Sequence, residues 1–111
     1  MKLLRLDESA QIRATHPMFI GNVFRQSLTE GLSDHLSVAM VSFQTGGRNT
    51  LHAHTSDQVL IITEGTGIVA TETEEQEVGV GDVIFIPAGE QHWHGAKPDT
   101  SMAHLAISVV R

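Results

Sequence analysis

The 111-residue sequence contains no cysteine. This absence excludes disulfide bonds, thiolate metal ligands and cysteine nucleophiles. Any catalytic group must therefore come from histidine, carboxylate, amide or hydroxyl side chains, or from a bound metal ion. The sequence also lacks tyrosine, yet it has seven histidines. In so short a chain, the positions of these histidines are the most informative feature.

Basic residues and long apolar stretches are scarce as well. Seven Lys and Arg stand against 13 Asp and Glu, for a formal net charge of −6. Nucleic-acid binding needs clustered basic residues, so we expect no nucleic-acid partner. No apolar run approaches the ~20 residues of a transmembrane helix, and the N-terminus lacks the pattern of a secretory signal. We therefore expect a cytoplasmic protein that does not associate with membranes.

The length of the chain predicts a single domain, because 111 residues suffice for one buried core but not for two. We expect residues 1–111 to form that domain, with a barrel core at about 36–110. The N-terminal segment, residues 1–35, is expected to pack on the barrel or at a dimer interface. A short helix is expected only in residues 7–15.

The rest of the sequence has the features of an all-β protein. Short runs rich in Val, Ile and Phe are separated by turn signals that contain Gly or Pro. One such turn is predicted at residues 64–67, and the acidic stretch 72–77 is predicted as a hairpin tip. These patterns favour a β-sandwich or β-barrel. The expected strands are 36–43, 58–63, 67–73, 82–86 and 102–110, with weaker candidates at 19–26 and 92–95.

Two histidines alternate in an extended segment, His52 and His54. Residues i and i+2 of extended backbone point to the same face, so the two imidazoles should converge. Either a transition metal or a hydrogen-bonded polar cluster would explain this convergence. A strand after Gly81, a tight turn and His92 follow later, and such a hairpin can bring His92 beside the first pair.

These segments resemble the two sequence motifs of the cupin superfamily, across nearly the whole chain. The first motif corresponds to Gly46, His52, His54, Gln58 and Gly65, with glutamine in place of the usual glutamate. The second corresponds to Gly81, Pro87, Gly89 and His92, with Ala96 where asparagine is often found. The resemblance implies a double-stranded β-helix, which is a jelly-roll β-barrel. It also implies one divalent metal ion per chain, bound by His52, His54, Gln58 and His92.

The proposed ligands favour a borderline divalent ion. Imidazole nitrogens with one oxygen donor suit Mn, Fe, Co, Ni or Zn, and affinity order alone does not select among them. Because Gln58 contributes a neutral amide oxygen, the ion would keep its full charge and act as a strong Lewis acid. The alternative is that Gln58 only forms hydrogen bonds beside a site of three histidines.

Two further histidines are candidate catalytic residues. His94 shares a face with His92 in extended backbone, and His104 shares a face with Ser108 in the last strand. On the cavity side, His94 could carry a proton or orient a substrate, and His104 could act as a general base near the metal. The alternative for His104 is a buried, hydrogen-bonded residue of the barrel core.

The sequence is also similar to a narrower group of small bacterial cupins that includes manganese-dependent hydroxynitrile lyases. This resemblance implies manganese as the ion and His104 as the residue that assists proton transfer. It implies cleavage of a cyanohydrin into an aldehyde and cyanide, although Ser108 replaces a glutamine of those lyases. The alternatives are a metal-dependent dioxygenase and a non-catalytic module that binds a small molecule. In each case the partner is a small molecule, and a homodimer is expected because jelly rolls expose strand edges.

Overall fold

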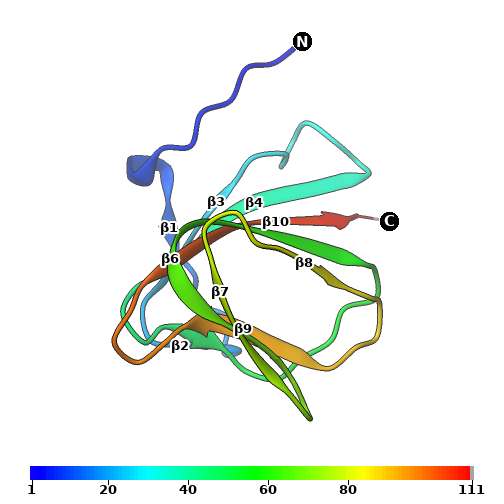
Figure 1. The fold of residues 1–111 in the computed structure, drawn as a ribbon. Coiled ribbons are helices and arrows are strands. Elements are labelled where there is room, and N and C mark those ends of the chain that lie inside the picture. The colour runs from blue at the N-terminus through cyan, green and yellow to red at the C-terminus, as the bar shows by residue number, and fades with distance from the viewer. Residues whose placement is uncertain (111) are drawn as a thin grey trace.

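The computed structural model describes residues 1–110 and contains two antiparallel sheets that face each other as the halves of an open barrel (Figure 1). The all-β jelly-roll fold predicted from the sequence is confirmed. Its elements are the 3₁₀ turn Glu8–Ala10 and the strands β1 Ile12–Arg13, β2 Phe19–Ile20, β3 Val23–Ser27, β4 Leu36–Phe43, β5 Arg48–Asn49, β6 Gln58–Thr71, β7 Glu75–Gly79, β8 Val83–Ile86, β9 His92–Ala96 and β10 Met102–Val109.

The long strand β6 belongs to both sheets. Its first half pairs with β10 and β8 in a sheet that continues through β4 and β3 to β1. Its second half pairs with β7 and β9 in the other sheet, which continues through β5 to β2. In Figure 1, β4, β10 and β8 form the upper layer and β9 and β2 the lower one. The sheets are therefore joined covalently in the middle of one strand.

The prediction of a turn at residues 64–67 is wrong. These residues lie within β6 and pair with β10 and β7, so the two expected strands 58–63 and 67–73 are one strand. Gly65 adopts a φ of 70°, in the left-handed region that glycine tolerates best. The glycine bends the strand from one sheet into the other without reversing it. A true reversal comes later, between β6 and β7, so the acidic segment 72–77 supplies a hairpin tip and the first residues of β7.

Two other predicted elements need correction. The helix expected at 7–15 is a single 3₁₀ turn, where the Asp7 carboxylate accepts a 2.9 Å hydrogen bond from the Ser9 N–H. The chain then enters β1, because Ile12 and Arg13 pair with the edge of β3. The expected strand 19–26 is two strands, β2 and β3, in different sheets. Among residues 1–110, no helix is long and apolar enough to cross a membrane.

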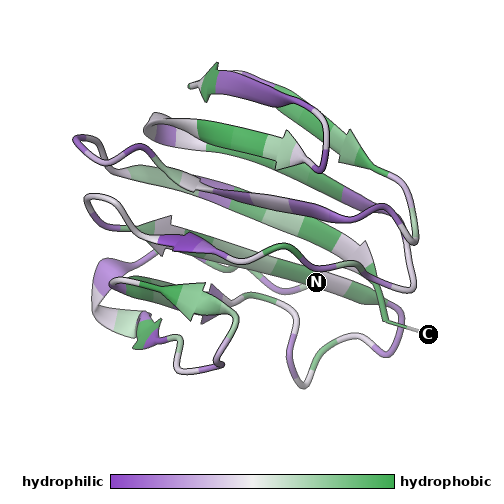
Figure 2. Cartoon of the chain, turned by 90° about the horizontal axis from the view of Figure 1, so that it is seen from below, coloured by the Kyte–Doolittle hydropathy of each residue, from purple (hydrophilic) through white to green (hydrophobic). Residues whose placement is uncertain are grey.

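The core lies between the sheets and is filled by the inward residues of each strand. Val23, Phe43, Leu60 and Ile62 have at most 1% of their surface exposed. Burying each of these side chains stabilises the fold by about 1.5–3 kcal/mol. The hydrophobic, green residues are concentrated in the strands, where they alternate with paler or purple ones (Figure 2). One histidine, His104, is as buried as the apolar core, at 0% exposed.

Candidate metal centre

Three histidines from two segments meet inside the barrel. His52 and His54 lie in the extended segment between β5 and β6, and His92 begins β9. The backbones of His52 and His92 exchange two hydrogen bonds, of 2.9 and 2.8 Å, so the two side chains leave the chain on the same face. Each of the three imidazoles offers a ring nitrogen within 4.8 Å of the others. The predicted convergence is present.

Backbone carbonyls fix the orientation of two of these rings. The Nδ1 of His52 lies 2.6 Å from the Thr50 carbonyl oxygen, and the Nδ1 of His92 lies 2.9 Å from that of Glu90. A carbonyl oxygen can only accept, so each Nδ1 carries the proton and each Nε2 keeps its lone pair. Histidines that bind metals are commonly oriented by such a bond from the second ring nitrogen. The Nε2 of His52 lies 3.2 Å from the Nε2 of His54.

Two buried polar atoms at this site have no hydrogen-bond partner among residues 1–110, the Nε2 of His92 and the Oε1 of Gln58. An unsatisfied buried polar atom costs about 1–3 kcal/mol. A divalent ion would satisfy both, and three imidazole nitrogens with an amide oxygen suit borderline transition metals. The donors present therefore fit a metal ion.

The protonation of the histidines suits the same role. Burial lowers the pKa of His54 and of His92, and the nearby His52 lowers both further. The Glu90 carbonyl opposes part of the shift at His92. Both rings are therefore neutral at pH 7, and only a neutral imidazole offers a lone pair to a metal.

His94 and His104 form a second buried pair behind the first cluster. The Nε2 of His104 lies 3.1 Å from the Nδ1 of His94, so one ring donates to the other. Asn49 holds His94 from the far side, because its Oδ1 accepts a 2.8 Å bond from the His94 backbone N–H. Its amide nitrogen lies 3.3 Å from the His94 Nε2 and 3.4 Å from the Nδ1. The Nδ1 of His104 has no partner among residues 1–110 and is the atom left for a bound molecule.

Burial keeps this second pair uncharged. It lowers the pKa of His104 to about 4, and it lowers that of His94 well below 6.5, aided by the charge that His104 would carry. Phe43 packs against both rings, with centroids 5.9 Å from His94 and 5.3 Å from His104, and helps to exclude water. Both rings are therefore neutral at pH 7, each with a single N–H.

Acidification should destabilise the metal-free protein through His104. Between pH 6.5 and 4 the unfolded chain binds a proton at this residue that the folded chain does not, so stability falls as the pH falls through this window. A shift from 6.5 to about 4 corresponds to about 3 kcal/mol of unfolding free energy. Urea denaturation of chelator-treated protein at pH 7 and pH 4 should show a smaller loss in His104→Gln than in the wild type. An equal loss of unfolding free energy in the wild type and in His104→Gln would show that His104 is not the group responsible for the acid sensitivity.

A cavity of about 170 Å³ runs alongside both groups of histidines. This is below the ~300–1,000 Å³ of pockets that hold drug-sized ligands, so the expected occupant is a small molecule. Sequence reasoning placed His52, His54, Gln58, His92, His94 and His104 at a common site, and all of them except His92 line this cavity. The other lining residues are Met18, Phe19, Arg25, Ser37, Ala39, Val41, Phe43, Asn49, Ala106 and Ser108.

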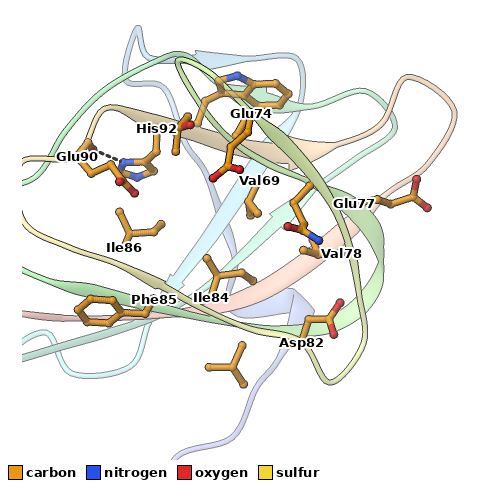
Figure 3. A pocket seen from close by; sticks show the side chains of 15 residues that line it. Val69, Glu74, Glu77, Val78, Asp82, Ile84, Phe85, Ile86, Glu90 and His92 are labelled. Atoms are coloured by element: carbon orange, nitrogen blue, oxygen red, sulfur yellow. Dashed lines mark hydrogen bonds between the residues drawn. The ribbon is translucent and has the colours of Figure 1, made fainter.

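A larger groove, of about 440 Å³, opens between β7 and β8 (Figure 3). Its floor is apolar, with Ile84, Ile86 and Val69, and His92 forms part of its wall. Four carboxylates belong to its lining, those of Glu74, Glu77, Asp82 and Glu90. Because only His92 among the clustered histidines lines this groove, the smaller cavity is the better candidate for chemistry.

Two residues of the site were missed from the sequence, Asn49 and Arg25. Asn49 follows a glycine pair and has no pattern that marks it as buried, although it is only 2% exposed. Arg25 alternates with Val23 and Ser27 in β3, and this period of two is the signal that places it on the inward face.

Comparison with known proteins gives four informative matches. The family model described as a cupin domain matches residues 39–109. An (R)-mandelonitrile lyase from Granulicella tundricola is 37% identical over 109 residues, covering 96% of this chain and 83% of the lyase. A crystal structure of a cupin-like protein from Thermotoga maritima has 34% identity and a TM-score of 0.82, covering 88% of this chain and 76% of that one. An acireductone dioxygenase from Leptospira biflexa is 38% identical over 63 residues, covering 53% of this chain and 36% of the dioxygenase.

Proposed function

This chain belongs to the cupin family, and we propose that it is an enzyme that uses a divalent metal ion, manganese in the first instance, as a Lewis acid. Its substrate is a small hydroxy or oxo compound, and the reaction is of the lyase or isomerase type. Cyanohydrin cleavage is one candidate, since the lyase relative is named for mandelonitrile and aligns over nearly the whole chain.

One observation carries the proposal, the convergence of His52, His54 and His92 beside two buried atoms without partners. His52, His54, His92 and Gln58 would bind the ion. The bound ion would supply Lewis acidity that polarises a hydroxyl or carbonyl oxygen of the substrate. All four ligands are neutral, so none of them reduces the positive charge of the ion.

The protein's own proton chemistry is assigned to His104. Its Nδ1 would accept the proton of a substrate hydroxyl or return one to the product. His94 contacts the other ring nitrogen of His104, and Asn49 holds His94 in place. Phe43 excludes water from both rings, so that the proton is exchanged with the substrate rather than with solvent.

The proposal is tested by metal analysis followed by a turnover screen. Protein purified without chelator should contain about one Mn, Fe, Co, Ni or Zn per chain. The loaded protein should then convert at least one member of a panel of cyanohydrins, keto acids and sugar acids. A loaded protein that turns over none of them would overturn the enzyme proposal, and a ligand recovered unchanged from a tight complex would favour the non-catalytic binding module.

A dioxygenase is the second candidate function. The match to an acireductone dioxygenase favours it, although that match covers about half of this chain. The neutral Gln58 argues against it, because a carboxylate is the commonest third ligand beside two histidines in iron oxygenases. Oxygen uptake by iron-loaded or nickel-loaded protein in the presence of a diketone would support the dioxygenase over the lyase.

We also propose that the chain forms a homodimer through the outward face of the first sheet. Val83, Phe85 and Val109 lie on that sheet and are 65%, 60% and 58% exposed. The start of the chain extends beyond the barrel (Figure 1), whereas Arg5 and Asp7 are hydrogen-bonded to Gln26 of β3. Leu3 and Leu6 of this segment are exposed and are assigned to the same interface. Contiguous exposed apolar surface of this kind commonly marks an interface. Light scattering should give twice the 12.0 kDa of one chain, and Phe85→Asp should give the single mass. A wild type of 12.0 kDa would exclude the dimer.

A further inference from the structure

Arg25, an exposed residue of β3, lines the same cavity as the histidines. Arg25 in β3 pairs with Val41 in β4, and Val41 pairs with His104 in β10. Residues that are directly opposite in antiparallel strands share a face. Arg25, Val41 and His104 therefore form one row across the inward face of the sheet, with His104 in the buried interior and Arg25 near the open edge.

Arg25 has no acidic partner in the described part of the chain. No carboxylate of residues 1–110 lies within 4.0 Å of its guanidinium, and the one ion pair found there joins Lys97 to Glu77. Glu30 lines two surface grooves that Arg25 also borders, yet it does not reach the guanidinium. An arginine presents a fixed fork of N–H donors that matches a carboxylate, and here the fork is free.

The charges around the barrel differ on its two sides. The groove between β7 and β8 is lined by Glu74, Glu77, Asp82 and Glu90 (Figure 3), whereas the cavity of Arg25 has no carboxylate in its lining. The whole chain carries a formal charge of −6, so the positive charge of Arg25 locally opposes the negative potential of the protein. An anion is repelled on the acidic side and attracted on the side of Arg25.

We propose that the substrate is a small carboxylic acid with a neighbouring hydroxyl or oxo group, and that Arg25 binds its carboxylate. This inference rests on the proposed function and narrows its substrate class from hydroxy and oxo compounds in general to those that carry a carboxylate. The four proposed metal ligands are imidazole and amide groups, and no Asp or Glu lines the cavity. A monoanion between the ion and Arg25 therefore meets positive charge on both sides and no negative side chain of the cavity lining.

Two hydroxyl groups complete the polar part of the cavity. Ser37 and Ser108 are paired residues of β4 and β10, and both line the cavity. Each can donate to a carboxylate or a hydroxyl oxygen. The volume of about 170 Å³ restricts the substrate to a compact acid.

Lactate and lactamide form a matched pair of probes, because they have the same shape and the same hydroxyl group but only lactate carries a charge. Manganese-loaded wild type, studied by titration calorimetry at low salt, should bind lactate at least about tenfold more tightly than lactamide. Arg25→Gln should lose this preference while its lactamide affinity and its metal content stay unchanged. Arg13→Gln is the matched control, since Arg13 pairs with Phe24 and lies on the opposite face of the sheet. This variant should keep the preference.

Equal affinities of the wild type for lactate and lactamide, or a preference that survives in Arg25→Gln, would overturn the inference. Failure of both probes to bind would overturn it as well. The titration is repeated on chelator-treated protein, where the preference for lactate should weaken but should still depend on Arg25. The two proposals are thus tested by different measurements. Metal analysis tests the proposed metal site, and the effect of Arg25→Gln on lactate binding tests the role of Arg25.

Discussion

Replacing both His52 and His54 with alanine is expected to remove the metal, from about one ion per chain to less than about 0.1. The two imidazoles are half of the proposed ligand set, and their Nε2 atoms lie only 3.2 Å apart. Loss of a group that merely supports a ligand already costs about 10–100-fold in metal affinity or activity, so loss of two ligands should cost more than 100-fold in turnover. Elemental analysis and initial rates on the same samples measure both effects.

The melting temperatures of the wild type and of the His52 and His54 double variant should also respond differently to a chelator. An ion present at 100 times its dissociation constant stabilises the folded chain by about 2.7 kcal/mol, so a chelator should lower the melting temperature of the wild type. The double variant should melt at the same temperature with and without chelator. A variant that replaces His16 and His35, which are both exposed, is the matched control and should behave as the wild type. Full metal content in the His52 and His54 variant would exclude these ligands.

Gln58→Ala distinguishes the two ligand sets that the sequence left open. If the amide oxygen binds the ion, metal content or affinity should fall in this variant. If Gln58 only forms hydrogen bonds beside three histidines, metal content should hold.

His104→Gln is expected to lower kcat by about 10²–10⁴-fold, which is the usual contribution of a general acid or base. Glutamine keeps a polar side chain in the buried position but cannot exchange a proton at pH 7. The residue is fully buried and lines the cavity, and its Nδ1 has no hydrogen-bond partner among residues 1–110. Because His104 is not among the proposed ligands, metal content should stay at the wild-type value. Steady-state rates on the substrate found in the turnover screen, with metal analysis of the same preparation, test this expectation.

Gln76→Ala is the control for this variant, since Gln76 is an exposed residue of β7 that does not line the histidine cavity. It should change kcat by far less than His104→Gln does. If kcat falls by less than about threefold in His104→Gln at full metal content, His104 is a hydrogen-bonded core residue and not a general acid or base. Circular dichroism of each variant shows whether the barrel has folded.

The sequence predicted the all-β fold because alternation and turn signals agree over most of the chain. The bounds of β4, Leu36–Phe43, match the expected strand, and β8, β9 and β10 differ from their expected ranges by at most one residue at either end. Two of the failures, the turn at 64–67 and the undivided strand 19–26, share one cause, which is the ambiguity of glycine. Gly65 was taken as part of a reversal, yet it bends a continuous strand, and only the pairing with β10 and β7 decides between these outcomes. Gly21 and Asn22, in contrast, divide the expected strand 19–26 between two sheets.

The candidate site was predictable where spacing determines geometry. His52 and His54 share a face at i and i+2, and the motif spacing brings His92 beside them. The neighbours that orient these groups could not be predicted, because they come from distant strands. Asn49 meets His94 across the pairing of β5 with β9, and Arg25 joins the row of His104 only through β4. Such contacts depend on strand order, which local patterns do not specify.

The hydrogen-bonded pair of His52 and His92 also bears on how the chain acquires its native state. These residues are forty positions apart, and their backbones can exchange hydrogen bonds only after both sheets have closed around β6. Contacts between distant positions form late because the entropy of loop closure must be overcome first, and barrels dominated by them fold in milliseconds to seconds. The three-histidine cluster is consequently absent from partly folded chains. Ion uptake during refolding would therefore report completion of the barrel rather than its initial collapse.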